Sequence, residues 1–228
     1  MARGIRAFLV RDRDGERSLP FMLALLIVVA FVLPSLGLEG SNERLYADVA
    51  FSLLLIVGVI IASAERKVFI LAALVTTAAL GIRWGNWFLP SGSMAVWREL
   101  ATVGTILLFS LVILAQVVRP GPVTAARLQG AVVVYLLLGI GWANVYAALQ
   151  VLQPGAFQGQ HGPPAAMNDW MYLSFVTLTT VGYGDIVPVH RVARTLAIGE
   201  ALTGQLYIAV LLARLVSLEV SARDRATG

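Results

Sequence analysis

Long apolar runs separated by short polar stretches dominate this sequence. The runs are Leu19–Leu38, Leu45–Ser63, Val68–Ile82, Leu100–Val118, Leu128–Leu152 and Val192–Val216. A helix needs about 20 residues, with a range of roughly 17 to 25, to cross the hydrocarbon core of a membrane. Five runs fit this range, and the third reaches it if the helix continues into the aromatic flank at Trp84, Trp87 and Phe88. The pattern therefore predicts six transmembrane helices.

A further apolar segment, residues 168–179, is too short to cross a membrane and lies between the last two runs. We expect it to form a helix that enters the membrane and returns on the same side. Asn168 or Asp169 is expected to cap this helix, because short polar side chains accept hydrogen bonds from the free N–H groups there and negative charge is favoured. The preceding stretch, residues 153–166, is rich in Pro, Gly and Gln and predicts an exposed loop.

Composition agrees with an all-α membrane protein. Hydrophobic residues make up 58% of the 228 residues and charged residues only 13%, whereas a soluble domain has about 25% charged residues. Cysteine is absent and histidine occurs twice, which argues against a disulfide framework, a thiolate metal site or a histidine-rich cluster. No group of titratable residues converges in the sequence, so we expect no enzyme. The net charge of +4 comes from residues scattered between apolar runs, so no nucleic-acid partner is expected.

Immediately after the short segment comes the run Thr180-Val181-Gly182-Tyr183-Gly184-Asp185. Glycine enters the left-handed backbone region without steric cost, so glycines at alternate positions allow successive carbonyl oxygens to point the same way. Such oxygens replace the hydration shell of a potassium ion, and Thr180 adds a hydroxyl at the inner end. This run, between a short aromatic segment and a long apolar helix, resembles the selectivity filter of the potassium channel family.

The resemblance implies a pore domain at residues 128–218, with one K⁺-selective filter per chain and no organic cofactor. Its parts are an outer helix 128–152, a turret 153–166, a pore helix 168–179, a filter 180–185 and an inner helix 191–218. K⁺ is expected at Thr180, Val181, Gly182, Tyr183 and Gly184. Asp185, Tyr172 and Thr179 are expected to support the filter, with Tyr172 donating a hydrogen bond to Asp185. Because a filter of this kind takes four loops, the chain is expected to form a homotetramer.

Two positions depart from the family pattern. Leu173 replaces an aromatic residue that usually braces the filter, and Val176 stands where some members have a glutamate. Leucine cannot donate a hydrogen bond. These departures affect the stability of the filter and not the conduction path. A weakly selective cation channel, or a non-conducting regulatory subunit, therefore remains as an alternative to a potassium-selective channel.

The inner helix holds candidates for the cavity and the gate. Gly204 occupies the usual position of a hinge, with close helix packing as the alternative and Gly199 as the competing hinge. The cavity and gate candidates on this helix are Gly204, Gln205, Ile208, Leu212, Val216 and Glu200. Glu200 is the acid in the middle of the run, where charge is costly and often functional. It can accept hydrogen bonds behind the filter, stay protonated, attract cations to the cavity, or make a structural contact.

The first four runs, residues 19–119, predict a four-helix domain that is not a conventional voltage sensor. Such a sensor carries arginine at every third position of its fourth span, and here no charge lies between Glu99 and Arg119. The acidic counter-charges expected of a sensor in the second and third runs are also missing, since Asp48 and Glu65 lie at opposite ends of the second run. The linker at 120–127 is short and contains Pro120 and Pro122, which favours packing of this domain on its own pore domain.

Charge placement predicts the orientation. With both termini inside, twelve of the lysines and arginines lie inside and five outside, which is the direction of the positive-inside rule. The basic segment at 1–18 is expected to contact anionic lipid and the residues 219–228 to form a short cytosolic tail. A cleaved signal peptide is disfavoured, because the leader holds acidic residues and no small-x-small site follows. We expect a multi-pass protein of the plasma or bacterial inner membrane.

Overall fold

The computed structural model describes residues 19–36, 41–61, 66–88, 92–119, 123–160, 162–164 and 166–227. The basic segment predicted at 1–18 lies outside these residues, as do the two prolines of the predicted linker and His161 in the predicted turret.

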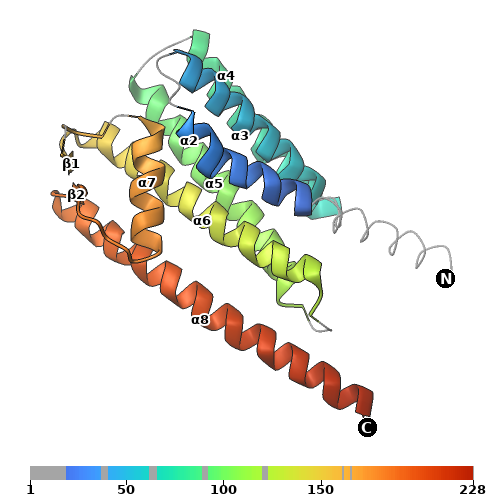
Figure 1. Ribbon diagram of the computed structural model, residues 1–228. Helices are drawn as coiled ribbons and strands as arrows, with labels where there is room; N and C mark the ends of the chain where they lie inside the picture. The colour runs from blue at the N-terminus through green and yellow to red at the C-terminus, as the bar shows by residue number, and fades with distance from the viewer. Residues whose placement is uncertain are drawn as a thin grey trace.

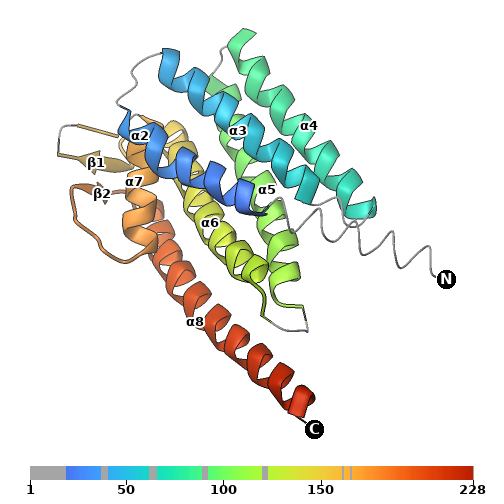
Figure 2. The same cartoon turned by 45° about the vertical axis from the view of Figure 1, so that its right-hand side comes forward.

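The described residues are mostly helical (Figure 1). The first helix, 19–27, continues through a π-helical turn, η1 (Val28–Val32), into α2 (Leu33–Ser35). The others are α3 (Ser41–Ile61), α4 (Arg66–Phe88), α5 (Gly92–Val117), α6 (Ala125–Leu152), α7 (Met167–Leu178) and α8 (Arg191–Thr227). Helix α6 runs through the middle of the molecule, with α3, α4 and α5 on one side and α7 and α8 on the other (Figures 1 and 2).

Four helices in the described part of the chain are long and apolar enough to cross a membrane. They contain the spans Arg66–Gly85, Ala95–Val117, Ala125–Leu152 and Arg191–Leu218. Helix α4 continues through the aromatic flank to Phe88, as predicted. The apolar helices of the first two runs are shorter, Leu19–Val32 and Leu45–Ile61. The chain is therefore a multi-pass membrane protein.

The structure adds detail to two of the predicted segments. The apolar span of α8, Arg191–Leu218, ends where the inner helix was predicted to end, and the helix itself continues through the predicted tail to Thr227. No Gly or Pro lies between residues 219 and 227 to end the helix. The predicted exposed loop at 153–166 contains a short strand, β1 (Phe157–Gly159), and the side chains of Ala156 and Phe157 are buried. The Pro, Gly and Gln content of this segment predicted only a loop and gave no indication that Phe157 would be buried.

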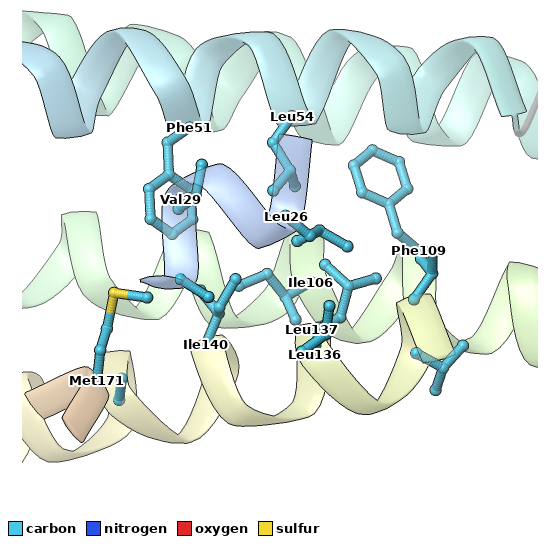
Figure 3. Close-up of a cluster of buried hydrophobic side chains, with 14 of the residues drawn as sticks. Leu26, Val29, Phe51, Leu54, Ile106, Phe109, Leu136, Leu137, Ile140 and Met171 are labelled. Carbon is cyan, nitrogen blue, oxygen red and sulfur yellow. The ribbon is translucent and has the colours of Figure 1, made fainter. Parts of the chain in front are cut away.

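The N-terminal helical segment, residues 19–35, packs with α3, α5, α6 and α7 of the same chain in one apolar cluster. Its Leu26 and Val29 lie in one buried apolar cluster with side chains from four other helices (Figure 3). The labelled partners are Phe51 and Leu54 of α3, Ile106 and Phe109 of α5, Leu136, Leu137 and Ile140 of α6, and Met171 of α7. Helix α5 also packs along α6. The position of α7 therefore depends on packing that begins in the N-terminal helices.

Helices α3, α4 and α5 hold a buried charge network that sequence analysis did not predict. Asp48 Oδ1 forms an ion pair with Arg83 Nε at 2.7 Å, and Trp87 Nε1 donates to Asp48 Oδ2 at 2.8 Å. Arg83 also donates to Thr102 Oγ1 at 3.3 Å and lies 4.4 Å from the centre of the Phe51 ring. Asp48 of α3 and Glu99 of α5 are both buried. Neither residue forms a periodic motif, so only the folded chain brings the network together.

We expect Asp48→Ala to lower the free energy of unfolding by about 3–5 kcal/mol, because it leaves the buried Arg83 charge without its partner. The measurement is thermal and denaturant unfolding in detergent, followed by circular dichroism. The double variant Asp48→Leu/Arg83→Met should recover most of the loss, because it removes both charges. Equal destabilisation by the single and double variants would contradict this account.

Candidate ion-conducting site

Helix α7 is fixed at its N-terminal end by Asp169 and by aromatic packing. Ala166 is the N-cap residue, so the predicted cap at Asn168 or Asp169 is shifted, and Asp169 Oδ2 instead accepts a hydrogen bond from the Ala166 N–H at 3.3 Å. The Trp170 ring packs edge-on against Phe157 of β1, with the ring centres 5.2 Å apart. The buried strand residue therefore holds the start of α7 in place.

The backbone after α7 alternates in conformation. Thr180, Gly182 and Gly184 have φ angles of +59°, +61° and +80°, whereas no positive φ occurs at the residues between them. The two glycines follow the predicted alternation. Thr180 extends it by one position and does so at a cost, because left-handed backbone is unfavourable for a residue with a Cβ atom. We name Thr180–Gly184 the candidate filter.

The C-terminal end of α7 holds the amides of the candidate filter. The Val181 and Gly182 N–H groups both donate to the Val176 carbonyl, at 2.9 and 3.3 Å, and the Thr180 N–H donates to the Thr177 carbonyl at 2.9 Å. Within the described chain, no donor is hydrogen-bonded to the carbonyl oxygens of Thr180–Gly184. The inner amides are thus bonded to the C-terminal end of α7, and the carbonyl oxygens of the candidate filter are left without a donor in the described chain.

The outer end of the candidate filter is held at Asp185. Its Oδ2 accepts a hydrogen bond from the Tyr172 hydroxyl at 2.6 Å, which is the predicted contact. This bond lowers the pKa of the Asp185 carboxyl, so the group keeps its negative charge. The Asp185 carbonyl accepts the Gln160 N–H at 3.1 Å. Strand β2 (Ile186–Pro188) then pairs antiparallel with β1, which ties the outer end to the loop after α6.

Helix α8 passes the inner end of the candidate filter. Gln205 Nε2 donates to Thr180 Oγ1 at 3.4 Å, so this candidate lies where the cavity is expected to begin. Ile208, Leu212 and Val216 follow at four-residue spacing and are each about half-exposed in the single chain, at 48%, 61% and 56%. They share one face of the helix, whereas Leu215 and Leu218 are buried.

Gly204 packs against the end of α7. A Cβ atom at this position would lie 2.1 Å from the Leu178 carbonyl oxygen, which is far inside contact distance. The helix runs through Gly204 without interruption. The structure therefore shows close packing and a straight helix at Gly204, and the hinge stays a prediction. At Gly199, a Cβ atom would only touch the Trp142 ring at 3.6 Å.

Residues 162–220 match the family described as "Ion channel". Over 90 residues the chain is 37% identical to "Two pore potassium channel c" of Oryza sativa subsp. japonica, which covers 40% of this chain and 18% of the relative. It is 38% identical over 87 residues to "Protein LctB" of Bacillus caldotenax, covering 36% and 64%. It is 43% identical over 58 residues to "Two-pore potassium channel 4" of Arabidopsis thaliana, covering 25% and 20%.

Residues 162–220 are therefore similar to an ion-channel segment, and the relatives that match this chain include proteins named as potassium channels. The chain spans less than two thirds of the length of each of these relatives. No solved structure matches it. The matched family and the relatives named for their activity are ion channels and not enzymes, which supports the prediction that this chain is not an enzyme. The matched residues contain α7, the candidate filter, β2 and most of α8.

Glu200 of this channel segment does not line a cavity, so its prediction as a cavity or gate residue is wrong. Its side chain is fully buried between α6, α7 and α8. It is hydrogen-bonded to the Ser174 hydroxyl at 2.5 Å and to the Tyr146 hydroxyl. Of the predicted alternatives, hydrogen bonding behind the filter is the one that the structure shows. Sequence analysis missed Tyr146 and Ser174, because a hydroxyl in an apolar helix carries no signal of its partner.

Proposed function

We propose that this protein is the subunit of a potassium-selective channel that conducts K⁺ passively through the carbonyl oxygens of Thr180–Gly184. The observation that carries the proposal is the alternation of backbone conformation at Thr180, Gly182 and Gly184, with the inner amides bonded to α7 and the carbonyls unbonded. A K⁺ ion gives up its water only where other oxygens replace it, and such a row of carbonyls does so. The Thr180 hydroxyl adds an oxygen at the inner end.

Four copies of the chain complete the proposed pore. In the single chain the side chains of Val181 and Tyr183 are 53% and 72% exposed, although both belong to the candidate filter. A largely apolar hollow of about 630 Å³ lies beside them, lined in part by Phe31, Tyr135 and Phe175. A neighbouring copy would cover these side chains and this hollow. With one filter per chain, the simplest assembly is a homotetramer.

We further propose six membrane spans with both termini in the cytoplasm, as charge placement favours. On this topology the domains are those predicted, a four-helix domain at 19–119 and a pore domain at 128–218. Helix α5 packs along α6 of the same chain, which supports a four-helix domain that stays with its own pore. The Asp48–Arg83 pair holds charge in place rather than letting it move through the field, so this domain acts as a scaffold.

A weakly selective cation channel is the second candidate, and Leu173 favours it. This side chain is buried at the place of the usual aromatic brace and cannot donate a hydrogen bond to Tyr183. The brace that remains is the bond between Tyr172 and Asp185. If that bond alone does not hold the carbonyls at the spacing for K⁺, Na⁺ would also pass.

The test is ion flux through the purified protein in liposomes under an outward gradient. We expect barium-sensitive K⁺ flux that exceeds Na⁺ flux by at least about 100-fold, which corresponds to ~2.7 kcal/mol of discrimination. Empty liposomes and liposomes with the Gly182→Ala variant serve as controls. Equal K⁺ and Na⁺ flux would favour the second candidate. Absence of flux over a range of pH and membrane tension would argue against a conducting homotetramer.

A further inference from the structure

Glu200 joins three helices behind the candidate filter. It lies on α8, its Oε1 is 2.5 Å from Ser174 Oγ on α7, and its Oε2 accepts the Tyr146 hydroxyl on α6. Ser174 and Tyr146 are also fully buried. Ser174 lies two residues before Val176, the residue whose carbonyl holds the Val181 and Gly182 amides. Any movement of α7 at Ser174 is therefore passed to the carbonyls of the candidate filter.

The number of available protons decides the charge of Glu200. Ser174 Oγ is 2.7 Å from the Gly139 carbonyl as well as 2.5 Å from Glu200 Oε1. A serine hydroxyl has one hydrogen, and a carbonyl can only accept. The Ser174 hydroxyl therefore donates its hydrogen to the Gly139 carbonyl. The short contact between Ser174 Oγ and Glu200 Oε1 then needs a second hydrogen. A protonated Glu200 supplies it and donates to Ser174, while Oε2 accepts from Tyr146.

The surroundings of Glu200 favour this neutral form. Among the described residues, no lysine, arginine or histidine forms an ion pair with it. The titratable groups that face it are Tyr146 and, earlier on α6, Tyr135. From α7 it is contacted by Ser174, which is uncharged. An unpaired carboxylate in such a place costs far more than a neutral acid whose hydrogen bonds are all made.

We propose that Glu200 is a neutral positioning residue that locks α7 to α6 and α8, and that loss of its proton releases the lock and loosens the filter. The part of this inference that concerns the filter rests on the proposed function. A carboxylate at this site has two oxygens that only accept, so the Ser174 hydroxyl must leave Gly139 to serve it. Water must also enter the site, or α7 must move, because nothing else compensates the cost of burying the charged carboxylate.

Glu200→Gln is the decisive variant, because glutamine reproduces the neutral acid. Its amide nitrogen donates to Ser174, its oxygen accepts from Tyr146, and it cannot lose a proton. At neutral pH we expect the same K⁺ to Na⁺ flux ratio as in the wild type. The variants Glu200→Ala and Ser174→Ala should lower that ratio by at least about fivefold, since each leaves a buried polar group without its partner. Thr203→Ala is the matched control, because its hydroxyl bonds only within α8, to the Gly199 carbonyl.

The response to alkaline pH distinguishes a proton lock from an ordinary structural contact. As pH rises and Glu200 loses its proton, the wild-type flux ratio should fall toward that of Glu200→Ala. The Glu200→Gln ratio should stay constant over the same range. An equal alkaline fall in the wild type and in Glu200→Gln would overturn the proposal, as would a loss of selectivity by Glu200→Gln at neutral pH.

Two measurements judge the lock without relying on conduction. Infrared spectroscopy at neutral pH should show a protonated-carboxyl carbonyl band in the wild type that is missing in Glu200→Gln and disappears in alkali. Hydrogen exchange of the α7 amides should become faster in Glu200→Ala and stay unchanged in Glu200→Gln. If these results hold and no variant conducts, the proposed function fails and the lock stands. Absence of the protonated-carboxyl band at neutral pH would contradict the proposal that Glu200 is neutral, whatever the ion flux.

Discussion

Gly182→Ala is expected to abolish potassium-selective flux while leaving the protein folded. The φ angle at Gly182 is +61°, a conformation that costs about 1–2 kcal/mol for a residue with a Cβ atom. The cheapest relief is rotation of the peptide plane, which turns a carbonyl away from the row that would bind K⁺. In a tetramer the change is present four times around one axis. The measurement is the K⁺ to Na⁺ flux ratio in liposomes, together with the elution volume of the assembly.

Gly155→Ala is the matched control for this experiment. Gly155 also has a positive φ, +85°, and at both positions an added Cβ would meet no atom within 4 Å in the single chain. It lies in the loop between α6 and β1, away from the candidate filter. We expect Gly155→Ala to retain selective flux with a similar backbone cost. Selective flux through Gly182→Ala would show that the alternation of backbone conformation is not the basis of conduction.

Gly204→Ala is expected to have the largest effect on folding and assembly. The added Cβ would lie 2.1 Å from the Leu178 oxygen and 3.0 Å from its carbonyl carbon, and backbone cannot move aside as a flexible side chain does. Overpacking of this kind costs about 1–3 kcal/mol and sometimes more. Displacing the end of α7 would also disturb the start of the candidate filter. We expect a lower unfolding temperature and a reduced yield of assembled protein.

Gly199→Ala, five residues earlier on the same helix, separates packing from flexibility. Both changes stiffen α8 equally, since alanine favours the helix over glycine by about 1 kcal/mol. At Gly199, however, the new methyl group has only an ordinary contact with Trp142 at 3.6 Å. This variant should be as stable as the wild type or slightly more so. If Gly204→Ala instead left stability unchanged and altered only channel opening, the hinge interpretation would be restored.

Features that depend on a few neighbouring residues could be predicted from the sequence. The apolar runs predicted the helices to within a few residues at most ends. A segment that crosses lipid must be helical and must carry mostly apolar side chains, so an apolar run of sufficient length marks the helix. The motif at residues 180–185 predicted the left-handed backbone at Gly182 and Gly184, because glycine adopts that conformation without steric cost. The hydrogen bond from Tyr172 to Asp185 was also predicted, as an implication of the resemblance to the potassium channel family.

The tertiary structure alone decided the features that depend on distant partners. Glu200 meets Tyr146, 54 residues earlier, and its role changed from a cavity residue to a contact behind α7. Gly204 became a packing glycine because the Leu178 carbonyl lies against it. Asp48 and Arg83 form an ion pair between two helices. The buried side chain of Phe157 anchors a short strand within the predicted polar loop. A single side chain states what it can bond to, but only the packing of helices determines which group it meets.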